Sequence, residues 1–227
     1  MRLAATHALG RLLHMGKPVL TTQDAALHLR MSVPAASRTL ARLAAAGLVL
    51  PVRRGLWSLD RQIDPLRLPE HLTAPFPAYV SLHSALYLHG MLSQIPQVVY
   101  VVSLAPTRTV RTRLGVYSIH RLAPRFFGGF ETTESGVRLA RPEKAVLDAL
   151  YLGPARSRLF ARLPEIEIPE SFDWTEARRW VRRIPKGPRR TMVERRLDAL
   201  LEGPRATSDG PTHGRGPRRA GRAVHSR

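Results

Sequence analysis

The sequence of 227 residues predicts an α+β fold in two units, and three observations indicate it. The first is a run of three short amphipathic helices within residues 1–65, followed by two short strands. The second is a mixture of apolar strands and helices between residues 66 and 202. The third is the segment 203–227, which is rich in Arg, Gly and Pro and poor in bulky apolar side chains. We therefore predict two folded units joined by a Pro-rich linker at 66–78, and a disordered tail at 203–227.

The first unit carries helix and turn signals in a recognisable order. A helix in "THALGRLLHMG" ends at Gly16, and Thr22 is predicted to cap a second helix. After a short turn, Ser32 caps a third helix, which Gly47 ends. The segment "LVLPVRRGLWSLD" then predicts two strands joined at "RRG". This order of elements is typical of a winged helix–turn–helix domain.

The second unit is predicted to be mixed α and β. Its strands are expected in "VVYVVSL", which is wholly apolar apart from its serine, and in "RTRLGVYSIHRL". Helices are expected in "YVSLHSALYLHGML" and "RPEKAVLDALYL". Two further helices begin with the spacing of a capping box, which predicts Asp173 with Glu176 and Thr191 with Glu194 as reciprocal caps.

The composition points to an anionic partner. Lys and Arg number 36 against 17 Asp and Glu, so the formal net charge is +19. Such an excess favours binding to polyanions. The absence of cysteine excludes disulfides, thiolate metal sites and cysteine nucleophiles. Because no stretch approaches the ~20 apolar residues of a membrane span, and no signal-peptide cleavage site follows the N-terminus, we expect a soluble cytoplasmic protein with no membrane partner.

The third helix of the first unit is the candidate for reading DNA. At 3.6 residues per turn, Ala36, Leu40, Leu43 and Ala44 share one face, and polar side chains lie broadly opposite. Arginine can bond a guanine edge with two hydrogen bonds, whereas arginines in the hairpin would contact phosphate or the minor groove. The predicted DNA-binding residues are Thr22, Gln23, Ser37, Arg38, Arg42, Arg53 and Arg54. The alternatives are an ordinary solvated face on an alanine-rich helix and, for Thr22, a cap alone.

Two blocks of the second unit carry a family resemblance. They are "SLHSALYLHG", from Ser81 to Gly90, and "RPEKAVLD", from Arg141 to Asp148. With the winged-helix pattern and "GVYSIHRLAPRFFGGFE", the chain resembles the AbiEi family over roughly residues 5 to 200. These proteins are the antitoxins and transcriptional repressors of bacterial AbiE-type (type IV) toxin–antitoxin systems.

The resemblance implies two activities and two partners. The first unit would repress the protein's own promoter on double-stranded DNA, with cooperative binding expected if the operator sites are paired. The second would take part in neutralising a cognate nucleotidyltransferase-like toxin, and direct contact with that toxin stays open.

An enzymatic alternative arises from Glu143, Lys144 and Asp148, which cluster in "RPEKAVLD". A metal-dependent nuclease needs a strand-borne acid with a basic residue two positions later, and this helical spacing does not provide it. A helix-start role for Glu143 and an i,i+4 pair of Lys144 with Asp148 fit better. His83 and His89 do not share a helix face. We therefore expect no enzyme activity, no metal and no cofactor.

The arginines of the second unit allow a second basic surface. It would extend the DNA footprint or touch the toxin's RNA substrate, and the alternative is a solvated face. Its candidate residues are Arg111, Arg113, Arg121, Arg125, Arg179 and Arg183. Two other functions remain open: a winged-helix regulator whose second unit senses a small molecule, and a nucleic-acid-processing enzyme, which the scarcity of paired carboxylates disfavours.

Overall fold

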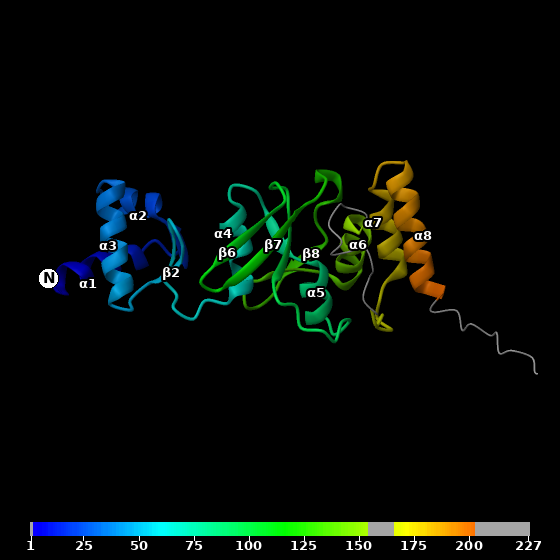
Figure 1. Cartoon of the computed structure of the whole chain (residues 1–227), viewed down its shortest axis with the longest axis horizontal. Coiled ribbons are helices and arrows are strands. Elements are labelled where there is room, and N and C mark those ends of the chain that lie inside the picture. The colour runs from blue at the N-terminus through cyan, green and yellow to red at the C-terminus, as the bar shows by residue number, and fades with distance from the viewer. Residues whose placement is uncertain (1, 154–165, 203–227) are drawn as a thin grey trace, which may run out of the picture.

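The computed structural model describes residues 2–153 and 166–202, and the described chain is mixed α+β with two sheets (Figure 1). The tail predicted to be disordered, 203–227, lies outside the described residues. The helices α1, α2 and α3 lie at one end of the molecule, and α7 and α8 lie at the other (Figure 1). None of the helices in the described ranges combines the length and apolar character that crossing a bilayer requires.

The first unit consists of three helices and a three-stranded antiparallel sheet. The helices are α1 (Arg2–Leu13), α2 (Thr22–Leu29) and α3 (Val33–Ala45). The strands β1 (Val19–Thr21), β2 (Leu50–Arg53) and β3 (Leu56–Ser58) pair in the order β1-β3-β2. The helices pack around buried apolar side chains that include Leu12, Leu20, Leu40 and Leu43. The predicted helices and hairpin are therefore present, whereas β1 is an addition that the sequence pattern did not indicate.

The turns of this unit match the local signals, with one correction. Arg30 ends α2 in the left-handed conformation, with φ 55°. The Ser32 hydroxyl accepts a hydrogen bond from the Ala35 N–H at 3.4 Å, and it caps α3 as predicted. The cap of α2 is Thr21 rather than Thr22. Its hydroxyl accepts from the Asp24 N–H at 3.0 Å, and its own N–H donates to the Asp24 carboxylate at 2.8 Å.

The second unit is built on a six-stranded mixed sheet in the order β6-β7-β5-β4-β9-β8. Its strands are β4 (Ala78–Val80), β5 (Val99–Ser103), β6 (Arg108–Thr112), β7 (Gly115–Arg121), β8 (Phe130–Thr132) and β9 (Arg138–Ala140). The pairs β5–β7 and β4–β9 are parallel, and the other three pairs are antiparallel. The helices are α4 (Pro69–Thr73), α5 (Leu82–Leu88), α6 (Pro142–Leu152), α7 (Trp174–Arg182) and α8 (Pro188–Glu202), with short 3-10 turns η1 (Pro65–Arg67) and η2 (Pro124–Phe126).

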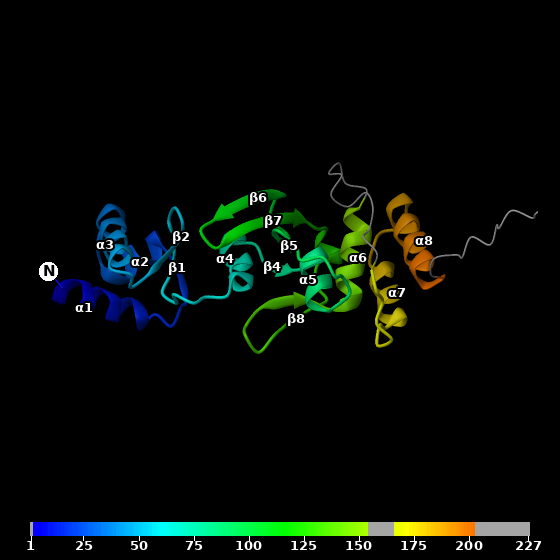
Figure 2. The ribbon, with the colours of Figure 1, turned by 60° about the horizontal axis from the view of Figure 1, so that its bottom comes forward.

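The helices α5, α6, α7 and α8 form the main core of this unit together with one face of the sheet. Figure 2 shows α6, α7 and α8 side by side at the end of the unit remote from α1–α3. Asp173 caps α7 as predicted, since its carboxylate accepts from the N–H groups of Thr175 and Glu176 at 2.8 and 2.9 Å. The predicted reciprocal bond from Glu176 is absent, because the Asp173 N–H donates to the Glu143 carboxylate instead. The predicted cap of α8 at Thr191 is wrong. That helix begins three residues earlier, at Pro188, where a missing N–H costs nothing.

The segment 66–78, predicted as a linker, packs between the two sheets. Leu68 and Leu72 are fully buried there. Their buried cluster draws Val52 from the first sheet and Tyr117 from the second. Because apolar burial stabilises by about 25 cal/mol per Å², a shared cluster of this kind favours one relative arrangement of the two units.

Candidate nucleic-acid interface

The solvent face of α3 carries the polar side chains that the sequence pattern places there. Ala36, Leu40 and Leu43 are completely buried, whereas Ser37, Arg38 and Arg42 are exposed. The helical period thus separates a packing face from a face that carries one hydroxyl and two guanidinium groups.

The two arginines of α3 differ in their contacts. The Arg42 Nη2 donates to the buried Thr39 hydroxyl at 3.3 Å. Arg38 makes no side-chain hydrogen bond or ion pair with any residue that the structure describes, and it lies one turn closer to the start of the helix. Arg38 is therefore the less constrained of the two side chains.

Thr22 is an exception among the predicted contact residues. Its side chain is buried, and its hydroxyl accepts a hydrogen bond from the Trp57 indole N–H at 2.9 Å. This contact joins α2 to β3 and gives Thr22 a packing role in place of the predicted DNA contact. Its neighbour Gln23 is exposed.

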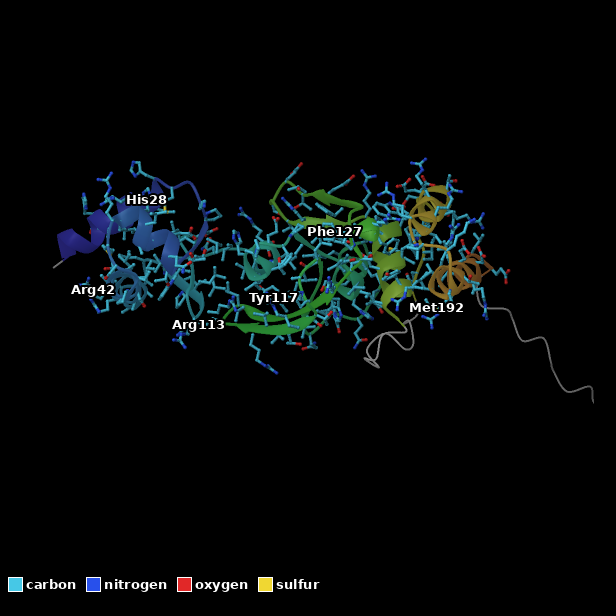
Figure 3. The ribbon with its side chains drawn as sticks, turned by 90° about the horizontal axis from the view of Figure 1, so that it is seen from above. His28, Arg42, Arg113, Tyr117, Phe127 and Met192 are labelled. Atoms are coloured by element: carbon cyan, nitrogen blue, oxygen red, sulfur yellow. The ribbon has the colours of Figure 1, made fainter. Side chains whose placement is uncertain are left out.

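The turn of the β2–β3 hairpin presents Arg53 and Arg54, both exposed. The β6–β7 hairpin of the second unit abuts this hairpin, since the Arg113 N–H donates to the Val52 carbonyl at 3.0 Å. The side chains of Arg111 and Arg113 are exposed. Figure 3 shows Arg42 and Arg113 on one side of the molecule and His28 on the opposite side. Arginines from both units therefore gather near the first hairpin.

The six arginines proposed as a second basic surface do not form one surface. Arg113 lies at the β6–β7 turn, whereas Arg121 ends β7. At ~3.3 Å per residue, these positions are about 20 Å or more apart along the strand. Arg125 follows in η2. The set thus divides into a group beside the first hairpin, Arg111 and Arg113, and a group at the far end of β7.

The two α7 members of the set are engaged within the protein. Arg179 pairs with the Glu176 carboxylate at 2.9 Å. The Arg183 guanidinium lies 4.0 Å from the centre of the Trp180 ring, within cation–π range. Both side chains are nevertheless exposed.

The Lys144–Asp148 pair is present but lies entirely inside the protein. Both side chains are within 1% of complete burial, and Lys144 Nζ contacts Asp148 Oδ1 directly. The carboxylate also accepts from the Ser81 hydroxyl at 2.8 Å and the Tyr79 hydroxyl at 3.0 Å. Lys144 Nζ lies 4.1 Å from the centre of the Phe126 ring. A substrate cannot reach these groups in this conformation, which supports the packing interpretation over the enzymatic one.

Burial governs the protonation of this cluster and of one other group. Burial raises the pKa of Asp148 and lowers the pKa of Lys144, and their mutual attraction opposes both shifts. Burial, with a smaller effect of His83, lowers the pKa of His120 to about 4. His120 is therefore neutral at physiological pH.

The Lys144–Asp148 pair, with three donors on its carboxylate, is suited to hold α5 and β4 against α6.

The Glu143 carboxylate has a structural partner as well. It accepts from the Asp173 N–H at 2.9 Å and so ties the start of α7 to α6. In the described ranges, no three His, Asp or Glu side chains group closely enough to hold a metal ion.

Comparison with known proteins adds no relative, since neither a family model nor a curated protein matches this sequence.

Proposed function

We propose that this chain is a DNA-binding transcriptional autorepressor that acts as the antitoxin of an AbiE-like toxin–antitoxin system. In this proposal α1–α3 and the sheet β1-β3-β2 form a winged helix–turn–helix domain, with α3 as the recognition helix and the β2–β3 hairpin as the wing. The observation that carries the proposal is the solvent face of α3. It presents Ser37, Arg38 and Arg42 on a helix whose opposite face is fully packed.

Residues of α3 would read bases, and the wing would contact the backbone. Arg38 is suited to two hydrogen bonds with a guanine, because its guanidinium is exposed near the start of α3. Arg53 and Arg54 would contact phosphate and set the register of the protein on the duplex.

The second unit would share the duplex contact through Arg111 and Arg113. The hydrogen bond from Arg113 to Val52, and the buried cluster between the sheets, support an approach of the two units as one body. Such a bipartite footprint adds phosphate contacts and so steepens the salt dependence of binding.

The antitoxin part of the proposal depends on the family resemblance. The two blocks that carry it form α5 and the start of α6, and they contact each other. His89 Nε2 donates to the Ala140 carbonyl at 2.7 Å, just before the second block, and Ser81 bonds Asp148 across the blocks. Much of the resemblance therefore lies in the scaffold of the second unit.

DNA binding is tested by fluorescence anisotropy with a duplex from upstream of the protein's own gene and a mixed-sequence duplex. We expect Arg38→Ala to weaken binding to the first duplex by ~1–3 kcal/mol and to reduce the preference for it. Arg113→Ala should weaken both duplexes alike and lower the salt slope by about 0.9. Arg195→Ala, which removes an exposed arginine on α8, is the control. Full binding by Arg38→Ala would refute the role of α3.

The antitoxin activity is tested by growth. If the proposal holds, a nucleotidyltransferase-like toxin is encoded next to this gene, and cells that express it should recover when this chain is co-expressed. If the chain folds and binds DNA but does not rescue growth, the antitoxin part of the proposal is refuted and the repressor part stands.

A further inference from the structure

Two adjoining concavities lie at the far end of β7, away from the first unit. The larger, of about 810 Å³, is bounded by β6, β7, the end of α6 and the start of α8. The smaller, of about 330 Å³, is bounded by η2 and the end of α7. The two share Ala123, Pro124 and Tyr151 in their walls, so they adjoin, and together they are called the groove below.

The groove is strongly basic. Its arginines are Arg108, Arg121, Arg125, Arg183 and Arg189, and none of the described residues in its walls is acidic. Arg108 and Arg189 are anchored by hydrogen bonds to backbone carbonyls, of Leu72 at 2.8 Å and Tyr151 at 3.3 Å. Within the described part of the chain, Arg121 and Arg125 make no side-chain hydrogen bond or ion pair. A groove with this excess of positive charge attracts anions.

The start of α8 adds to the same field. This helix has 15 residues, begins at Pro188 and has no acidic residue in its first turn, and Arg189 from that turn lines the groove. The N-terminal end of the α8 dipole therefore adds a partial positive charge at the groove wall.

The remaining walls suit bases and sugars. Pro124 supplies exposed apolar surface, and Ser118 and Thr109 supply hydroxyl groups. The Tyr151 ring stacks on Phe126 at 4.8 Å between centroids, and the Arg189 guanidinium lies 4.8 Å from the Tyr151 ring centre. Arg189 is exposed, and an exposed guanidinium plane next to a basic track is a feature on which proteins stack the bases of single strands.

The size of the groove selects the form of the ligand. Each concavity has the volume of a pocket for a small ligand, ~300–1,000 Å³, which admits individual nucleotides, whereas bases that are paired and stacked in a duplex cannot enter it. We propose that this groove binds single-stranded nucleic acid, with phosphates on Arg121 and Arg125 and bases against the apolar walls. The site is separate from the duplex site of the proposed function and does not depend on it.

The test uses the full chain and three labelled probes: RNA and DNA single strands of about 12 nucleotides, and a mixed-sequence DNA duplex. The variant Arg121→Glu/Arg125→Glu should weaken binding of single strands about tenfold or more and lower the salt slope by at least ~1.4, at ~0.7 per phosphate contact. It should leave duplex binding nearly unchanged. Arg113→Ala should do the reverse and lower the salt slope of duplex binding by about 0.9, so failure of either site is seen separately.

The control is Arg182→Glu/Arg195→Glu, which changes the net charge equally at exposed positions outside the groove walls. Circular dichroism and thermal melting confirm that each variant folds. If the two double variants weaken single-strand binding equally, the effect comes from net charge alone and the proposal is overturned. Competition by a mononucleotide as strong as by the 12-mer, or an equal loss of duplex binding, would also overturn it. A selective loss of RNA or DNA single-strand binding in Arg121→Glu/Arg125→Glu supports the proposal. The ratio of the two affinities shows whether ribose or deoxyribose is preferred.

Discussion

Replacing Asp148 by Asn tests whether the Lys144–Asp148 pair is structural. The substitution keeps the shape of the side chain and removes its charge. Lys144, which is buried in α6, would then lose the only carboxylate that it contacts among the described residues. If the pair belongs to the scaffold, the cost appears as lost stability.

The magnitude follows from the burial of both groups. Breaking a buried ion pair from one side costs about 3–5 kcal/mol, because the remaining charge stays out of water. Lys144 would keep its hydrogen bond to the Tyr79 hydroxyl at 3.0 Å and the Phe126 ring at 4.1 Å. Since a cation–π contact of a desolvated ammonium contributes roughly 2 kcal/mol, we expect a loss near the lower end, about 3 kcal/mol.

The assay is urea unfolding followed by tryptophan fluorescence, since the Trp180 ring centre lies 5.3 Å from Lys144 Nζ. Glu194→Gln is the matched control. It breaks a pair with Arg190 at the same i,i+4 spacing on a partly exposed helix face, where we expect a loss under about 1 kcal/mol. The double variant Lys144→Met/Asp148→Asn should be less destabilised than the sum of its single variants, because it leaves no unpaired charge.

Two results would refute this reasoning. A loss for Asp148→Asn no larger than that of Glu194→Gln would mean that the buried charge is not held by the pair. Additive single and double variants would mean that Lys144 and Asp148 do not stabilise each other.

Three further predictions concern local contacts. Thr22→Val should cost ~1–3 kcal/mol in urea unfolding, because it leaves the Trp57 indole N–H without its acceptor; no loss would show that water replaces the hydroxyl. Gly129→Ala should destabilise more than Gly47→Ala by at least ~1 kcal/mol. Both glycines have positive φ, but a Cβ at Gly129 would meet side-chain atoms at 2.8 and 2.9 Å, whereas Gly47 faces open space; equal losses would exclude the clash. The pKa of His120 is lowered from 6.5 to about 4, so the unfolded chain binds the extra proton between these values. Stability should therefore be fully present above pH 6.5 and should fall as pH decreases toward 4, and His120→Asn should remove that part of the pH dependence.

Features that depend on neighbours in the chain were predictable. The cap at Ser32, the stop at Gly47 and the cap at Asp173 involve partners within a few positions. The two faces of α3 follow from the helical period alone. In each case the interacting groups are within one or two turns, so the sequence order already places them together.

Features that depend on partners far away in the chain could not be predicted from the sequence. The strand β1 has three residues and exists because β3 pairs with it, Leu20 opposite Trp57. Thr22 is polar and at the start of a helix, which predicts exposure, yet Trp57 covers it from 35 positions away. The same limit applies to the arginines of the second unit, because strand direction decides which end of the sheet each reaches.

The Lys144–Asp148 pair shows the division between the two sources. Its spacing on one helix is written in the sequence, and that spacing alone determined that the two side chains meet. Only the tertiary structure decided that they meet out of water, because Tyr79 on β4 and Trp180 on α7 enclose Lys144 from other parts of the chain. A helix period determines which residues share a face, but what covers that face depends on packing between distant segments.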